Sequence, residues 1–289
     1  MSHTVTFWGT RGSIPTPGPG TTRYGGNTPC ISVTNGGDRL VILDAGSGLR
    51  CLGHELMLSQ GDRPLRADLL ISHTHWDHIQ GLPFFKPLSA RGNAVHVFGA
   101  AQEGVPLEDI LGRQMDRMVF PVPLKALTAA ITVTDIGIAP FEIDGFRVST
   151  CRLRHPGTTL GYVLEPLGGG RKFAYLTDNE LGDGGSYPVP DDWRAGLVEC
   201  LAGVDTLIHD AMYTDQMIRA RAGWGHSTPK QAVDLAVEAG CRRLILFHYE
   251  PEHDDATMDR IVSEARAYAR TLAPALEVDA AVEGLTFTL

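Results

Sequence analysis

Short apolar runs recur along the chain, and loops rich in glycine and proline separate them. Continuous apolar runs predict strands buried on both faces, at residues 40–43, 69–71 and 244–247. Segments with helical periodicity alternate with such strands, at residues 49–59, 228–240 and 256–272. Because no linker or composition break divides the chain, we expect an α/β fold in a single domain of residues 1–289. In that fold, two sheets would face each other with helices outside them.

Residues that can bind a metal follow several of these apolar strands. They are His73, His155, Asp178, the pair His209-Asp210, and His248. A single histidine at a strand end is more often inert than a ligand. If the strands lie side by side in two facing sheets, however, their ends share one edge, and residues far apart in sequence converge there. The joint pattern therefore predicts one site.

The densest cluster is the six-residue stretch 73–78, His-Thr-His-Trp-Asp-His, directly after the apolar run 69–71. Three imidazoles and a carboxylate are hard to bury together without a cation, and these ligand types suit zinc, with manganese or iron left open. The spacing does not fit one helical face. In a tight loop, His73 and His75 would point to one side while Asp77 and His78 point to the other, which suits two metal ions better than one.

Three further polar residues have two interpretations each. Asp44 follows the strand at 40–43 and would either accept the second N–H of a metal-bound imidazole or form a turn. Arg11 lies in a long glycine- and proline-rich loop and would either bind a substrate phosphate or be a structural arginine. Asn27, in the same loop, would either contact substrate or serve turn geometry.

The segment 101–127 departs from the strand pattern. It contains an expected helix around residues 107–118, followed by a proline-rich exit. Met115, Met118 and Phe120 would cover a pocket as a lid, or form an interface, or belong to a helix that packs on the core, and the last is favoured.

Composition limits the class of partner. The chain has 289 residues, 43% hydrophobic and 20% charged, with a formal net charge of −9. An acidic surface repels a long polyanion, so we do not expect large nucleic acid as substrate, although two bound divalent ions would make the pocket itself positive.

Cysteine usage and the termini bear on location. The five cysteines are odd in number and contain no C-x-x-C pair, so they predict neither a disulfide framework nor a thiolate metal site. We therefore expect a reducing compartment. No signal peptide and no membrane-spanning run is visible in the sequence, and the expectation is a cytoplasmic protein that does not enter a membrane.

In these motifs the chain resembles the metallo-β-lactamase superfamily over nearly its whole length. His73, His75, Asp77 and His78 match the H-x-H-x-D-H signature of that family, and His155, Asp178 and His248 fall where its later ligands fall. The resemblance implies a four-layer αβ/βα sandwich and two divalent metal ions. One ion would be bound by His73, His75 and His155, and the second by Asp77, His78 and His248, with Asp178 bridging both.

Two later motifs resemble the phosphodiesterase branch of the superfamily. Residues 209–213, His-Asp-Ala-Met-Tyr, are similar to its His-Glu-Ala-Thr-Phe stretch, and residues 225–228 match its Gly-His-Ser-Thr. The resemblance implies a two-metal displacement at phosphorus in which His226 is the general acid, Asp210 orients it and Asp77 belongs to the catalytic group. Aspartate replaces the usual glutamate, so a direct contact between Asp210 and His226 has to be tested. The alternative role for His226 is that of a neighbour of a helix cap at Thr228.

The spacing of two ligands bears on the substrate. RNase Z members of the branch carry a long tRNA-binding arm between the third histidine ligand and the bridging aspartate. Here only residues 156–177 separate His155 from Asp178, and a hairpin fills them. We therefore expect a small phosphodiester as the substrate, with 3′,5′-cyclic nucleotides ranked first.

Other functions stay open at this stage. The alternatives are an RNase Z-like tRNA 3′-processing endonuclease and a metallo-hydrolase of a thioester or lactam. A non-catalytic binding module would be expected to have lost ligands, and all seven are present. The resemblance is compatible with a homodimer, while the sequence itself leaves the oligomeric state open.

Overall fold

The computed structural model describes residues 3–34, 39–59, 61, 63–143 and 145–289. Within them, two seven-stranded sheets face each other. The first has the order β14 (Thr286–Thr288), β1 (Thr4–Gly9), β2 (Cys30–Thr34), β3 (Arg39–Leu43), β4 (Arg66–Leu70), β5 (Ala94–Gly99) and β6 (Ala130–Asp135). Strands β3 to β6 are parallel, and the register pairs Leu43 with Leu70. Asp44 and the stretch that leads to His73 therefore leave the sheet at the same edge.

The second sheet has the order β13 (Glu277–Ala280), β12 (Arg243–Phe247), β11 (Val204–Asp210), β10 (Lys172–Leu176), β9 (Leu160–Pro166), β8 (Phe146–Arg152) and β7 (Phe141–Ile143). Strands β10 to β13 are parallel, and the register aligns Leu176 with His209 and His209 with Leu246. Asp178, Asp210 and His248 consequently follow their strands at one edge, as the joint pattern of strand ends predicts.

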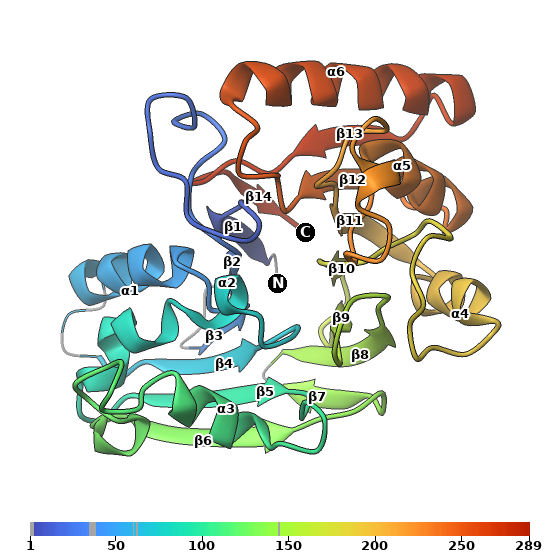
Figure 1. Cartoon of the computed structure of the whole chain (residues 1–289). Helices are drawn as coiled ribbons and strands as arrows, with labels where there is room; N and C mark the ends of the chain where they lie inside the picture. The colour runs from blue at the N-terminus through green and yellow to red at the C-terminus, as the bar shows by residue number, and fades with distance from the viewer. Residues whose placement is uncertain (1–2, 35–38, 60, 62, 144) are drawn as a thin grey trace.

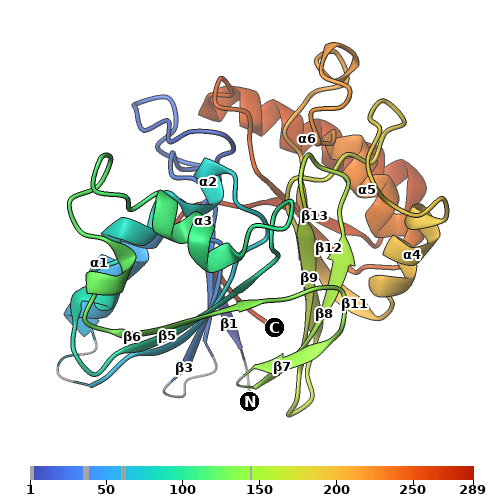
Figure 2. The same ribbon diagram turned by 60° about the horizontal axis from the view of Figure 1, so that its bottom comes forward.

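Helices cover the outer faces of both sheets. The helices beside the first sheet are α1 (Gly48–Ser59), α2 (Trp76–Ile79) and α3 (Leu107–Arg113), and those beside the second are α4 (Trp193–Cys200), α5 (Pro229–Glu238) and α6 (Asp255–Leu272). Figures 1 and 2 show the two groups on opposite sides of the paired sheets. Short 3₁₀ turns occupy Leu82–Phe84, Lys86–Ser89, Leu124–Ala126 and Ile218–Ala220. The αβ/βα sandwich expected from the resemblance is confirmed.

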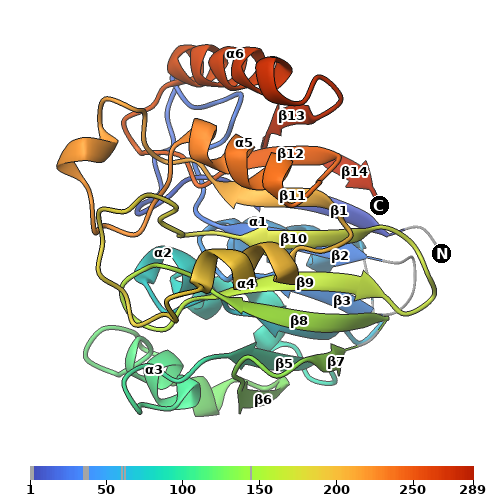
Figure 3. The same ribbon diagram turned by 90° about the vertical axis from the view of Figure 1, so that its right-hand side faces the viewer.

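The apolar runs are continuous because the strands are buried on both faces. In β3, Val41 and Leu43 belong to the apolar core between the sheets, whereas Leu40 and Ile42 pack in the layer beneath α1 and α3. In the second sheet, β8, β9 and β10 run side by side with α4 across them (Figure 3). Both sheets are therefore held between two apolar layers, and their polar strand ends project from one edge.

Three local features of the structure differ from the sequence analysis. Strand β2 was not predicted, the stretch 73–78 contains the short helix α2 as well as a loop, and the helix expected at 107–118 ends at Arg113. Met115 is buried in the apolar layer beside the first sheet, and Met118 is 91% exposed. The core-packing interpretation therefore holds for Met115, whereas Met118 lies on the surface.

The structure corrects the interpretation of the cysteines. A disulfide joins Cys151 of β8 to Cys200 of α4, and the free cysteines are Cys30, Cys51 and Cys241. The two cysteines are 49 positions apart, so no local sequence pattern predicts that they pair. The inference of a reducing compartment loses its ground, because it rested on the absence of disulfides. Among the described residues, no helix is both long and apolar enough to cross a bilayer.

Candidate active site

The six-residue motif divides into two groups of ligand atoms, as its spacing predicts. Helix α2 begins at Trp76, so the chain turns between His75 and Asp77. Two clusters result, within each of which the ligand atoms lie within 4.8 Å of one another: His73 with His75 and His155, and Asp77 with His78, Asp178 and His248. All of these side chains are buried except that of His75, so the first cluster opens toward solvent.

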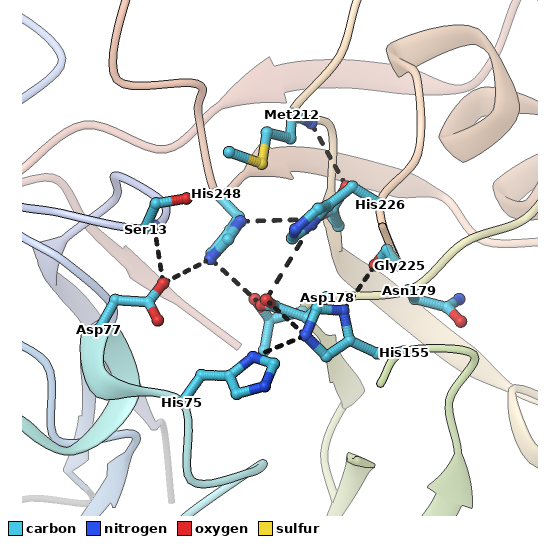
Figure 4. Close-up of polar contacts among 12 residues, drawn as sticks. Ser13, His75, Asp77, His155, Asp178, Asn179, Met212, Gly225, His226 and His248 are labelled. Carbon is cyan, nitrogen blue, oxygen red and sulfur yellow. Dashed lines mark hydrogen bonds and ion pairs between the residues drawn. The ribbon is translucent and has the colours of Figure 1, made fainter. Parts of the chain in front are cut away.

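Asp178 lies between the two clusters. Its Oδ2 is 3.7 Å from Nε2 of His73 and 3.6 Å from Nε2 of His155. Its Oδ1 is 3.1 Å from Nε2 of His78 and 3.2 Å from Nε2 of His248. One oxygen therefore faces each cluster, and Figure 4 shows the carboxylate between the rings of His155 and His248. This is the position that a bridging ligand requires.

The residues present fit divalent cations. Within the described chain, Nε2 of His73 and Nε2 of His78 are buried without a hydrogen-bond partner. Nε2 of His155 lies 2.9 Å from Nδ1 of His75, so two ring nitrogens converge on the same space. Burial lowers the pKa of His155 to about 4, which keeps this imidazole neutral, as a ligand must be. Unpaired buried acceptors of these types suit a divalent metal such as zinc.

Asp44 orients one of the ligands. Its Oδ2 accepts from Nδ1 of His78 at 2.7 Å, and the carboxylate also accepts from the amide and hydroxyl of Ser72 and the hydroxyl of Tyr175. The contact fixes the ring so that Nε2 points toward Asp178. Of the two roles weighed for Asp44, the orientation of an imidazole is the one that the structure shows.

The loop after β1 supports the metal ligands from the other side. The amide of Ser13 donates to Oδ2 of Asp77 at 2.7 Å (Figure 4). A Cβ on Gly12 would lie 2.5 Å from the ring of His248, so only glycine allows this approach. The glycine-rich loop therefore positions two ligands, a role that the sequence did not suggest.

Arg11 and Asn27 have structural positions. Arg11 is fully buried, and its guanidinium donates to the backbone carbonyls of Gly25, Glu250 and His253. Because the side chain is buried and its Nε and Nη1 donate to backbone carbonyls, the structural interpretation of Arg11 fits the geometry better than contact with a substrate phosphate. The side chain of Asn27 donates to Glu283 at 3.0 Å and accepts from the hydroxyl of Ser47. Because both ends of this side chain are engaged within the protein, a structural role for Asn27 fits the geometry better than contact with substrate.

His226 and Asp210 form a direct pair. Nδ1 of His226 lies 2.7 Å from Oδ2 of Asp210, so the shorter aspartate still reaches the imidazole. The amide of Ser227 donates to Oδ1 of Asp210 at 2.8 Å, which holds the carboxylate in place. Burial opposes ionisation of Asp210, but the attraction of His226 and His248 lowers its pKa to about 2 and keeps it charged. With Nδ1 engaged by Asp210, Nε2 of His226 is the nitrogen left for a substrate.

The alternative role for His226, as a neighbour of the helix cap at Thr228, does not explain the position of its ring. Thr228 caps α5 in a capping box with Gln231, so the cap does not need the imidazole. The ring of His226 instead lies 5.1 Å from that of His155 and 5.2 Å from that of His248, measured between centroids. It belongs spatially to the ligand clusters.

Comparisons with known proteins agree with this architecture. The family model described as "Beta-lactamase superfamily domain" matches residues 39–249. The chain belongs to the β-lactamase superfamily. It is similar to the ribonuclease Z of Natronomonas pharaonis, with 29% identity over 92% of this chain and 93% of that protein. It is also similar to the ribonuclease BN of Cronobacter sakazakii, with 24% identity over 91% and 94% of the two chains. The resemblance to the RNase Z-like branch is thereby confirmed.

Solved structures share the fold at lower identity. A diphosphatase of the PhnP family matches with a TM-score of 0.66 and 21% identity over 100% of this chain and 98% of the other. The short form of human tRNase Z matches with a TM-score of 0.62 and 23% identity over 98% of both. As a member of this hydrolase superfamily, the chain is an enzyme, and the fold implies divalent metals in the His/Asp site.

Glu180 is a buried residue of this superfamily member that sequence analysis missed. Its carboxylate accepts from the amides of Gly223 and Gly225 at 2.9 and 3.0 Å and from the hydroxyl of Tyr187. Gly225 in turn accepts from Nδ1 of His155 at 3.0 Å through its carbonyl. Glu180 therefore fixes the loop that orients His155 and leads to His226. The only signal in the sequence was an acidic residue two positions after Asp178.

His209 does not join the ligands, although it was counted among the metal-capable strand ends. Its Nδ1 donates to the backbone carbonyl of Asp210, and Nε2 accepts from the side-chain amide of Asn179 at 3.1 Å. Burial lowers the pKa of His209, which favours this neutral form. The residue is a satisfied core histidine.

Proposed function

We propose that this enzyme is a dinuclear metal-dependent phosphodiesterase that acts on a small phosphodiester, with 3′,5′-cyclic nucleotides as the first candidates. The observation that carries the proposal is the His226–Asp210 pair, 2.7 Å apart, directly beside the two ligand clusters. A poor leaving group such as an alkoxide needs a proton donor as its bond to phosphorus breaks. A thioester or lactam hydrolase could use the same metals without such a pair.

The residues divide the work as follows. Divalent ions held by the two clusters, zinc or manganese, would neutralise charge on the phosphoryl group and make water acidic enough to attack near neutral pH. Nε2 of His226 would donate its proton to the departing oxygen. Asp210 holds Nδ1–H and stabilises the imidazolium before transfer. A positioned general acid of this kind contributes about 10²- to 10⁴-fold to the rate.

The form of the molecule supports a small substrate. Strands β9 and β10 pair in antiparallel fashion between His155 and Asp178, and residues 167–171 join them without an inserted arm. The formal net charge of −9 also disfavours a large RNA. That one fold neighbour is named a diphosphatase is compatible with this choice. A tRNA 3′-processing activity is the second candidate, because the similar curated proteins are named ribonuclease Z and ribonuclease BN.

A hydrolysis screen of the metal-loaded protein tests the proposal. It compares 3′,5′-cyclic mononucleotides, 2′,3′-cyclic mononucleotides, bis(p-nitrophenyl) phosphate and a precursor tRNA. We expect turnover of the small diesters and an intact tRNA. Cleavage of the precursor at its 3′ side would overturn the choice of substrate in favour of the second candidate. Inactivity on all four would overturn phosphodiesterase activity itself and favour a thioester or lactam.

The variant His226→Ala tests the general acid. We expect turnover of a cyclic nucleotide to fall about 10²-fold or more, with little loss of bound metal, because His226 serves the leaving group. His54→Ala is the matched control, since His54 is exposed on α1. Equal activity of the two variants on an ester with a poor leaving group would refute the assignment of His226.

The proposal also covers domain organisation and oligomeric state. One hydrolase domain would span residues 1–289, as a monomer or a homodimer. Sedimentation of the purified chain measures the oligomeric state directly.

A further inference from the structure

A cavity of about 380 Å³ opens beside the first ligand cluster. His73 and His75 line one side of it, and the segment from Gln102 to Arg113 lines the other. Neither His226 nor Asp210 contributes to its lining. A group bound there would be next to the reacting phosphorus but away from the general acid, so the cavity suits a part of the substrate that does not react.

The outer wall of the cavity is fixed to the loop that carries His155. Nε2 of Gln102 donates to the carbonyl of Thr158 at 2.7 Å, and its Oε1 accepts from the amide of Thr158 at 2.8 Å. The backbones of Gln102 and Val105 pair across a tight turn in which Glu103 and Gly104 have φ values of 49° and 81°. A non-glycine residue in that conformation is uncommon, and the turn presents Glu103 at the cavity.

Two charged side chains of opposite sign line this cavity without partners. Arg113 is in the last turn of α3, and Glu103 is in the turn before that helix. In the part of the chain that the structure describes, both side chains are exposed and neither makes a hydrogen bond or an ion pair with another residue. Val105 and Ile110 add partly buried apolar surface to the lining. The cavity thus offers the guanidinium of Arg113 as a hydrogen-bond donor, the carboxylate of Glu103 as an acceptor, and an apolar surface.

We propose that this cavity binds the base of a nucleotide, with Arg113 and Glu103 as specificity-determining residues; the inference rests on the proposed phosphodiesterase function. An arginine fork pairs with two adjacent acceptors, as on the O6/N7 edge of guanine, and a carboxylate accepts from ring and exocyclic N–H groups. Guanine presents both kinds of edge, while Val105 and Ile110 would contact its ring face. The volume is near the lower end for ligand pockets, which suits one nucleoside and not an oligonucleotide.

Calorimetric titration of the metal-loaded full chain tests the inference without turnover. The probes are guanosine 5′-monophosphate and ribose 5-phosphate, which share the sugar phosphate and differ in the base. We expect the nucleotide to bind roughly tenfold more tightly or better. Arg113→Met should remove most of that difference, and Arg113→Lys should restore only part of it, because lysine keeps the charge but not the fork.

Arg117→Met is the matched control. Arg117 is also exposed, four residues further along the chain, and does not line the cavity. It should keep the full preference for the nucleotide, and the thermal midpoints of all variants show that they are folded. Equal binding of the two probes, or an equal loss of preference in Arg113→Met and Arg117→Met, would overturn the proposal.

The hydrolysis screen separates this inference from the proposed function. Turnover of bis(p-nitrophenyl) phosphate together with equal binding of the two probes would remove the base-binding cavity and leave the phosphodiesterase. Base-dependent binding through Arg113 in a protein that cleaves no phosphodiester would support the cavity and remove the proposed reaction.

Discussion

Individual residues at the site have unusual backbone conformations. In the described chain, the non-glycine residues with positive φ are Ser13, Asp44, Glu103, Asp178 and His248. Asp178 and His248 belong to the ligand clusters, Ser13 and Asp44 bond to ligands, and Glu103 lines the adjacent cavity. Each such residue costs about 1–3 kcal/mol. Asp44, Asp178 and His248 follow strand ends, and there the left-handed conformation accompanies a side chain that enters the site.

Asp44 should influence metal affinity through the hydrogen bond that it accepts from His78. In Asp44→Asn, one carboxylate oxygen becomes an NH₂ group, which accepts no hydrogen bond, so either the Ser72 amide at Oδ1 or the donors at Oδ2, His78 among them, lose their acceptor. We expect metal affinity about 10- to 100-fold lower, measured by elemental analysis after dialysis against graded zinc buffers. Asp192→Asn, at an exposed position, is the control. The same metal content in both variants would show that His78 does not need Asp44.

Whole elements were predictable where one physical constraint dominated. Strands buried on both faces have continuous apolar runs, so β3, β4 and β12 were visible in the sequence, and the proline after Thr228 marked the start of α5. Helix α2 was missed, because four residues are too few to show a period. Glu180 was missed because two of its partners are backbone amides of a loop more than 40 residues away. Contacts of this kind leave no local pattern.

A disulfide links strand β8 to helix α4, and its effect on stability can be measured. With the Cys151–Cys200 disulfide formed, only Cys30, Cys51 and Cys241 should react with a thiol reagent in urea without reductant. Cys200→Ser should lower the free energy of unfolding by about 2–4 kcal/mol, because the bond closes a long loop in the unfolded chain. Urea titration measures this loss, with Cys51→Ser as the control. Reaction of all five cysteines in the wild type would show that the disulfide is absent.

The site exists only in the whole molecule, because its ligands come from both sheets. His73, His75, Asp77 and His78 follow β4, whereas His155, Asp178 and His248 follow strands of the second sheet. The sequence predicted this convergence from the shared strand-end pattern and the family resemblance. It could not predict which loops hold the two edges together, since the contacts of Arg11 and Ser13 join segments remote in sequence.

Metal binding should therefore stabilise the contact between the sheets, and removing the metals should weaken it. Without cations, the buried carboxylates of Asp77 and Asp178 lie together and the imidazoles around them lose their common partner. A ligand present at 100 times its Kd contributes about 2.7 kcal/mol to the free energy of unfolding. A chain of this length should then lose roughly 5–10 °C in its thermal midpoint after chelation, and added zinc should restore it. His75→Ala, which removes one ligand of the first cluster, should show a smaller difference between the chelated and zinc-loaded states. An identical midpoint for chelated and zinc-loaded wild type would mean that the two sheets hold these ligands in place without metal.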